Sequence, residues 1–173
     1  NDILQRKQIE RVNSINEKVW EIATEESARY VIKNMRNAKM FLSVPKYHEW
    51  LKEFIKDNQS KEGLNLEFGV ADGNSLHKLV SSEMNKFYGF DSFKGLPEDW
   101  IPEYEEGTFA RTGLPEVPDN VELIAGWFDN SLPEFIKRED INCKKADFIH
   151  IDCDLYTSTK TVFEYIGKFI KKG

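Results

Sequence analysis

The sequence has little cysteine and no long apolar segment. Its 173 residues include two cysteines, Cys143 and Cys153, which have neither the spacing of a metal site nor the density of a disulfide scaffold, so we expect both to be reduced. No apolar stretch approaches the roughly 20 residues that span a bilayer, and residues 1–18 are too polar for a signal peptide. These absences predict a cytoplasmic protein without a membrane partner.

The chain also lacks an excess of basic residues. Lys and Arg number 24 against 30 Asp and Glu, which gives a net charge of -6. Binding to nucleic acid requires clustered positive charge, so no nucleic-acid partner is expected. Hydrophobic residues make up 40% and charged residues 31% of the chain, as in folded globular domains, and the length suits one hydrophobic core.

Glycine and proline are absent from residues 2–40. Apolar residues recur there at the spacing of an amphipathic helix; these are Ile9, Val12, Ile15, Val19 and Ile22. A second helix is predicted over residues 45–57, because it opens with proline and has apolar residues at helical spacing. Residues 1–60 are therefore predicted to form a helical N-terminal extension or cap, which is a candidate surface for homo-oligomer formation.

Short apolar runs alternate with helical stretches after residue 63. This alternation predicts an α/β, Rossmann-like parallel sheet with helices on both faces over residues 61–173. The expected strands are residues 64–68, 86–90, 121–125 and 147–152, and the expected helices are residues 75–84, 132–138 and 157–171. Four strands are few for such a sheet, so we expect it to be incomplete at the C-terminus of this chain.

A segment rich in Gly, Pro and acidic residues, 92–120, separates the second and third expected strands. Loops of this length in compact domains often cover a ligand site. Residues 98–112 interleave five acidic side chains with Trp100, Tyr104 and Phe109. We expect this part to be a mobile cover whose aromatic side chains close on a ligand.

The first motif, residues 67–75, combines a strand end, a turn of small residues and a helix start. Nucleotide-like ligands bind at this place in open α/β sheets. Gly69 and Gly73 would let the backbone approach a ligand, and Ser75 lies where free N–H groups favour an anion such as a carboxylate. Asp72 would repel a pyrophosphate but attract a sulfonium, which favours S-adenosylmethionine over a nicotinamide dinucleotide. An ordinary strand-turn-helix is the alternative.

The second and fourth expected strands also end in acids. Asp91 follows Glu67 by 24 positions, near the interval of about 20 at which a Rossmann-type strand presents an acid to ribose hydroxyls; a solvated turn aspartate is the alternative. His150, Asp152 and Asp154 share one side by the two-residue period. The two aspartates suggest proton acceptance or a hard cation. Yet His150 can equally be a core residue, and Asp154 can cap the next helix.

Together these motifs resemble those of the class I S-adenosylmethionine-dependent methyltransferases, and specifically the macrocin O-methyltransferase-like family. The family's acid-x-Gly-Val-x-x-Gly-x-Ser turn corresponds to residues 67–75, and its Gly-Phe-Asp-Ser-Phe-x-Gly-Leu-Pro-Glu segment to residues 89–98. Its His-Ile-Asp-x-Asp-Leu-Tyr strand end corresponds to residues 150–156, and its third strand and adenine loop to residues 120–128. The resemblance covers about residues 64–173.

The resemblance implies a role for each matching position. Ser75 would hold the carboxylate of the cofactor and Asp91 its ribose, while Trp127 and Phe128 would border its adenine. The complete set of expected cofactor-binding residues is Glu67, Gly69, Ala71, Gly73, Asn74, Ser75, Asp91, Ser92, Gly126, Trp127, Phe128 and Asp152. The expected catalytic residues are Asp152 and Asp154.

Asp152 corresponds to the acid that binds magnesium in metal-dependent relatives, so Mg²⁺ is a candidate cofactor with Asp152 as a ligand. The other two metal acids of those relatives follow the next strand, beyond Gly173. Leu155 stands where catechol-type relatives carry a lysine base, which excludes that mechanism. The resemblance implies attack by a hydroxyl of a small molecule, such as a sugar or natural product, on the sulfonium methyl. A nicotinamide-dependent oxidoreductase and a catalytically silent scaffold are the alternatives.

Overall fold

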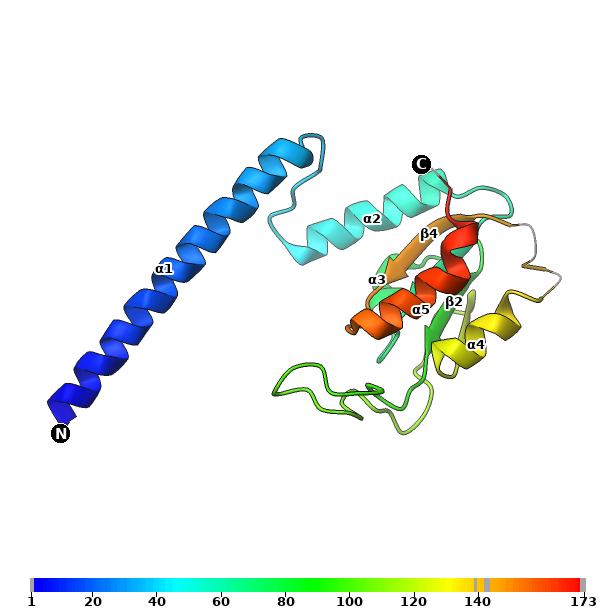
Figure 1. Cartoon of the computed structure of the whole chain (residues 1–173). Coiled ribbons are helices and arrows are strands. Elements are labelled where there is room, and N and C mark those ends of the chain that lie inside the picture. Colours follow the sequence, from blue (N-terminus) through cyan, green and yellow to red (C-terminus); the bar gives the residue numbers. More distant parts are fainter. Residues whose placement is uncertain (1, 139, 142–143, 172–173) are drawn as a thin grey trace. The chain divides into compact units, whose positions relative to one another are not determined.

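The computed structural model describes residues 2–138, 140–141 and 144–171. The chain divides into two compact units, residues 1–42 and 43–173. The first unit contains the helix α1 (Asp2–Asn34), drawn in blue in Figure 1, which confirms the predicted N-terminal helix. Within this unit its apolar side chains Val12, Ile15, Val19 and Ile22 are 48–57% exposed.

The second unit is built on a parallel sheet. Its strands are β1 (Leu64–Phe68), β2 (Phe87–Asp91), β3 (Val121–Ala125) and β4 (Ala146–Ile151), in the order β3-β2-β1-β4, and each neighbouring pair is parallel. Every residue of β1 is buried, as expected for a central strand that is covered on both faces. The predicted Rossmann-like sheet is confirmed, and each strand boundary lies within one residue of its prediction.

Two pairs of helices cover the two faces of this sheet. Helices α2 (Val44–Asn58) and α3 (Asn74–Leu79) contribute Leu51 and Leu76 to one apolar cluster. Helices α4 (Phe128–Phe135) and α5 (Tyr156–Ile166) contribute Leu132 and Val162 to the other, which also contains Phe68. A short 3-10 helix, Gly167–Phe169, follows α5. The prediction of helices on both faces is therefore confirmed.

The unit boundary differs from the one predicted near residue 60. Helix α2 belongs to the sheet unit because Leu51 and Ile55, 8% and 3% exposed, pack in the cluster that includes α3.

Helix α4 begins four residues before its predicted start, because the Trp127 carbonyl already accepts hydrogen bonds from Asn130 and Ser131. Pro133, predicted near the helix start, lies inside it. The C-termini of α3 and α5 also come earlier than predicted.

Residues 92–120 form the long connection expected between β2 and β3. It contains an isolated bridge between Ile101 and Tyr104, and Leu96 and Thr108 are joined by a backbone hydrogen bond of 2.8 Å. Trp100, Tyr104 and Phe109 lie in one aromatic row. None of the helices in the described part of the chain has the length and hydropathy of a membrane span.

Candidate functional site

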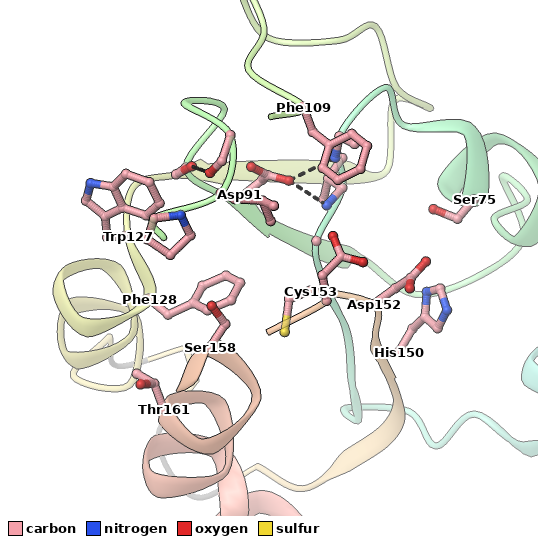
Figure 2. A pocket seen from close by; sticks show the side chains of 18 of the residues that line it. Ser75, Asp91, Phe109, Trp127, Phe128, His150, Asp152, Cys153, Ser158 and Thr161 are labelled. Atoms are coloured by element: carbon pink, nitrogen blue, oxygen red, sulfur yellow. Dashed lines mark hydrogen bonds between the residues drawn. The ribbon is translucent and has the colours of Figure 1, made fainter. Parts of the chain in front are cut away.

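A cavity of about 930 Å³ lies at the carboxyl ends of the strands (Figure 2). Its size falls in the range of small-molecule sites. Segments that follow all four strands line it, together with residues of α5 and of the 92–120 loop. Ten of the twelve cofactor-binding residues expected from the sequence line this cavity, and they are Gly69, Ala71, Asn74, Ser75, Asp91, Ser92, Gly126, Trp127, Phe128 and Asp152.

Gly69 lies where β1 and the segment after β4 approach closely. Its φ is +92°, and a Cβ on this residue would overlap the carbonyl oxygen of Asp152. The Asp152 amide in turn donates a 2.8 Å hydrogen bond to the Phe68 carbonyl. Glycine is thus required by the packing of two chain segments, independently of any ligand.

The Asp91 carboxylate holds the turn after β1. Its Oδ2 accepts hydrogen bonds from the amides of Val70 and Ala71, both 2.9 Å (Figure 2). Its Oδ1 accepts one of 2.7 Å from the amide of Phe93. A carboxylate has about four lone-pair sites, so it retains capacity for a ligand hydroxyl. The solvated turn aspartate considered as an alternative is not what the structure shows.

Asp72 is paired with a cation. Arg111 of the loop donates a 2.8 Å hydrogen bond from Nη2 to Asp72 Oδ2, and the pair is partly exposed. The positive charge of Arg111 compensates the carboxylate. The expectation that Asp72 would repel a pyrophosphate and attract a sulfonium assumed an unpaired carboxylate. The ion pair with Arg111 shows that this assumption is wrong.

Glu67 lies beneath the cavity instead of lining it, contrary to expectation. It is fully buried; its Oε1 accepts a hydrogen bond from the Ser75 hydroxyl, and its Oε2 lies 3.3 Å from His150 Nδ1. This carboxylate raises the pKa of His150. Because the Ser75 hydroxyl donates its hydrogen to Glu67, the remaining donor of Ser75 for a ligand is its backbone amide. Gly73 also lies outside the lining, as the N-cap of α3 with φ +73°.

His150, Asp152 and Asp154 all line the cavity, as their two-residue spacing predicts. Partial burial, and then the charges of Asp152 and Asp91, raise the pKa of the Asp154 carboxyl. The N-cap of α5 is Leu155, without a side-chain capping bond. Asp154, with φ +58°, therefore does not cap this helix, and the capping alternative is not supported.

Aromatic and hydroxyl side chains line another part of the cavity. Trp127 precedes α4 and Phe128 begins it, with the Phe128 ring edge-on to Phe68 at 5.8 Å between centroids. Ser158 and Thr161 of α5 also line the cavity, and neither was expected from the sequence. Their three-residue spacing places them on one helix face, but that face is identified only once the packing of α5 is known.

One of the two cysteines lies in the described part of the chain. Cys153 is a free thiol whose pKa is raised by burial, whereas Cys143 lies outside the described residues.

Within residues 2–138, 140–141 and 144–171, no group of three or more His, Cys, Asp or Glu side chains is placed to hold a metal ion. Magnesium prefers an octahedral set of oxygen ligands, so Asp152 with its described neighbours does not fit the expected Mg²⁺ site.

Comparison with known proteins identifies related sequences and folds. A family model described as a methyltransferase domain matches residues 66–173. A solved structure of CalS11, described as a calicheamicin methyltransferase, superposes with a TM-score of 0.61 at 21% identity, covering 84% of this chain and 67% of that one. No curated protein sequence matches the chain.

A second solved structure is similar at the level of fold. It is an apo form of CalS11, described as a TDP-rhamnose 3'-O-methyltransferase of calicheamicin biosynthesis, with a TM-score of 0.52 at 19% identity, and it covers 83% of this chain and 66% of that one. This chain thus spans about two thirds of the length of either structure. Identities this low relate the folds and leave the function to be argued from the site.

Proposed function

The chain belongs to the methyltransferase-domain family, and we propose that it transfers a methyl group from S-adenosylmethionine to a hydroxyl oxygen of a small molecule. The family match favours this activity over the nicotinamide-dependent oxidoreductase kept as an alternative, which would share the parallel sheet. Membership of the macrocin O-methyltransferase-like group is part of the proposal, since the matching family is the broader one.

The observation that carries the proposal is the position of Asp91. Its carboxylate closes the turn after β1 and lines the same cavity as Trp127 and Phe128. A nucleoside bound there would have its ribose hydroxyls at Asp91 and its base beside the two aromatic rings. We assign the ten lining residues, Asp152 included, to cofactor binding, and Glu67 and Gly73 to support of the turn from outside the cavity.

Asp152 and Asp154 are the proposed catalytic residues. S-adenosylmethionine supplies a methyl group already activated on a sulfonium. The acceptor oxygen forms the new C–O bond as the C–S bond breaks, and its hydroxyl proton passes to a carboxylate of this pair. Asp152 orients the hydroxyl and accepts its proton, and Asp154, whose pKa is raised by partial burial and then by the charges of Asp152 and Asp91, is the alternative acceptor. Leu155 offers no base at the next position.

We further propose that the acceptor is a sugar or a sugar-bearing natural product. CalS11, which shares the fold, is described as acting on TDP-rhamnose, and this supports a sugar without identifying one. The requirement at the site is a hydroxyl that can reach the two aspartates. No metal enters the proposed mechanism.

Binding and turnover test the proposal separately. We expect calorimetry to show binding of S-adenosylmethionine and of its demethylated product, and none of NAD. We expect Asp152→Asn to retain the fold and much of the cofactor affinity while single-turnover methyl transfer falls by about 10²-fold or more, the low end of acid–base contributions. NAD binding without S-adenosylmethionine binding would refute the proposal, and near wild-type transfer by Asp152→Asn would remove its catalytic role. Binding of neither cofactor would indicate a silent scaffold.

A further inference from the structure

Phe109 occupies a backbone position that normally belongs to glycine. Residues 107–110 form a turn closed by a 3.1 Å hydrogen bond from the Ala110 amide to the Gly107 carbonyl. Phe109 is the third residue of this turn and has φ +70°. Turns with positive φ at this place favour Gly or Asn, and the conformation is rare for a bulky side chain. An aromatic residue there is not explained by the turn itself.

Backbone hydrogen bonds hold this turn in place without the Phe109 side chain. The amide of Gly107 donates to Leu96, 2.9 Å, and the amide of Arg111 donates to Phe93, 3.0 Å. The side chain of Arg111 also pairs with Asp72. Since these bonds fix the backbone on both sides of residue 109, the phenyl ring is not needed to form the turn.

The Phe109 ring is instead presented to the cavity. It lines the cavity together with Asp91 and Asp152, and all three side chains are labelled in Figure 2. Behind it, the ring stacks on Tyr104 with 5.4 Å between centroids and an interplanar angle of 29°, and Tyr104 contacts Trp100 at 5.5 Å. Neither Tyr104 nor Trp100 lines the cavity. Tyr104 and Trp100 therefore support the Phe109 ring from one side, and its other face is available to a ligand.

Carboxylates accompany Phe109 on the loop side of the cavity. Glu98 and Glu106 both line it, and Glu98 Oε1 accepts a 2.6 Å hydrogen bond from the Thr157 hydroxyl. Among the ion pairs of the described residues, none joins Glu98 or Glu106 to Lys or Arg. Lys78 and His48 line the cavity from α3 and α2. Carboxylates without a cation accept hydrogen bonds from hydroxyls and repel phosphate.

We propose that Phe109 is a specificity-determining residue of the acceptor site, and that this site selects an uncharged, hydroxyl-bearing ring. The C–H face of the acceptor ring stacks on Phe109, while hydroxyls on its edge donate to Glu98 and Glu106. A phosphate on the acceptor is disfavoured, so the acceptor differs in this respect from the diphosphate-linked sugar named for CalS11. This inference rests on the proposed methyl transfer, since it places the acceptor in the same cavity as the cofactor.

The test replaces Phe109 with the residue that the turn favours. Phe109→Gly relieves the unfavourable φ, so its melting temperature should equal or exceed that of the wild type, and its affinity for the demethylated cofactor product should be unchanged. With this product bound, saturation-transfer NMR measures binding of the methyl pyranosides of glucose, galactose, mannose and rhamnose, and of the corresponding sugar 1-phosphates. We expect at least one pyranoside to bind to the wild type and to bind about fivefold or more weakly to Phe109→Gly. We expect the 1-phosphate of the same sugar to bind the wild type more weakly than the pyranoside does.

Two further variants serve as controls. Trp100→Ala removes a ring from the same aromatic row but not from the cavity, so pyranoside binding should persist. Phe109→Tyr keeps an aromatic ring at position 109, so it should bind the pyranoside like the wild type, unlike Phe109→Gly. Equal pyranoside binding by wild type and Phe109→Gly, or no pyranoside binding by the wild type, would overturn the inference, as would preferred binding of the 1-phosphates. A loss of cofactor affinity in Phe109→Gly would assign the ring to the cofactor instead. If the wild type binds no cofactor product, the proposed function itself fails.

Discussion

At the scale of single residues, the cavity depends on side chains that serve the backbone as well as a ligand. Asp91 accepts three backbone hydrogen bonds, and Glu67 links Ser75 to His150. The strand-end position of Asp91 was sufficient to predict that it faces the site. The burial of Glu67 was not predictable from its motif, because the sequence does not show that β4 brings His150 beside it.

Asp91→Ala should weaken binding of the demethylated cofactor product by about 1.5–3 kcal/mol, the range for hydrogen bonds to a charged group. It should also lower the melting temperature, because the amides of Val70, Ala71 and Phe93 lose their acceptor. Calorimetry and thermal unfolding measure the two effects. Asp72→Ala is the matched control, since it removes a carboxylate of the same turn that is paired with Arg111, and it should retain the affinity. Unchanged affinity in Asp91→Ala would exclude a ligand contact.

The pair of Glu67 and His150 should make stability depend on pH. Because Glu67 raises the pKa of His150, the folded state binds this proton more tightly than the unfolded state does. The stabilisation is complete below the unfolded value of about 6.5 and is lost as pH rises through the higher folded value. The free energy of unfolding lost in His150→Asn should therefore be larger at about pH 5.5 than at about pH 9.

Chemical denaturation at the two pH values measures this difference. In Glu67→Gln, the pKa of His150 determined by NMR should fall, because the carboxylate that favours the imidazolium is gone. The same loss at both pH values, together with an unchanged pKa in Glu67→Gln, would show that the two side chains are not coupled.

At the scale of elements, strands were easier to predict than helix ends. Residues 64–68 form a short apolar run between turn residues, and β1 has the predicted bounds. The start of α4 is set by the local backbone, since the Trp127 carbonyl accepts hydrogen bonds from Asn130 and Ser131. The side of α5 that carries Ser158 and Thr161 is set by its packing on the sheet, which is remote in sequence. The cavity lining was therefore predictable at strand ends and not along α5.

Residues 98–112 are predicted to open locally when no ligand is bound. Their hydrogen bonds are mainly internal to the loop, and side-chain links such as Glu98 to Thr157 and Arg111 to Asp72 connect it to the rest of the unit. Such segments exchange amide hydrogens quickly. Hydrogen exchange should be fast without ligands and slower when cofactor product and acceptor are both bound. The amides of β1, protected in both states, are the internal control, and strong protection of the loop in both states would show a static cover.

At the scale of the whole molecule, α1 is a candidate for self-association. Its side chains Val12, Ile15, Val19 and Ile22 follow the alternating three- and four-residue spacing of a helix-pairing seam, and they are about half exposed within their unit. We therefore predict that the chain forms a homo-oligomer through its N-terminal helices. The sequence predicts this seam but not the partner, because one chain does not show what covers it.

Light scattering coupled to size-exclusion chromatography tests this prediction. The wild type should have a mass greater than that of one chain, and the double variant Ile15→Lys with Val19→Lys should have the mass of one chain, because two charges enter the apolar seam. Ser14→Lys adds a charge beside the seam and should associate like the wild type. Equal masses for the wild type and the double variant would exclude association through this seam.

The hydrogen bonds of Asp91 also bear on the thermodynamics of ligand binding. The bonds that Val70, Ala71 and Phe93 donate to Asp91 are made within the chain, so we expect the turn to lose its conformational entropy when the chain folds and not when a ligand arrives. The ligand then meets a preorganised surface. The heat-capacity change on cofactor binding should accordingly be small and negative, reflecting burial of the adenine and of the aromatic lining, without the larger contribution of a segment that folds upon binding.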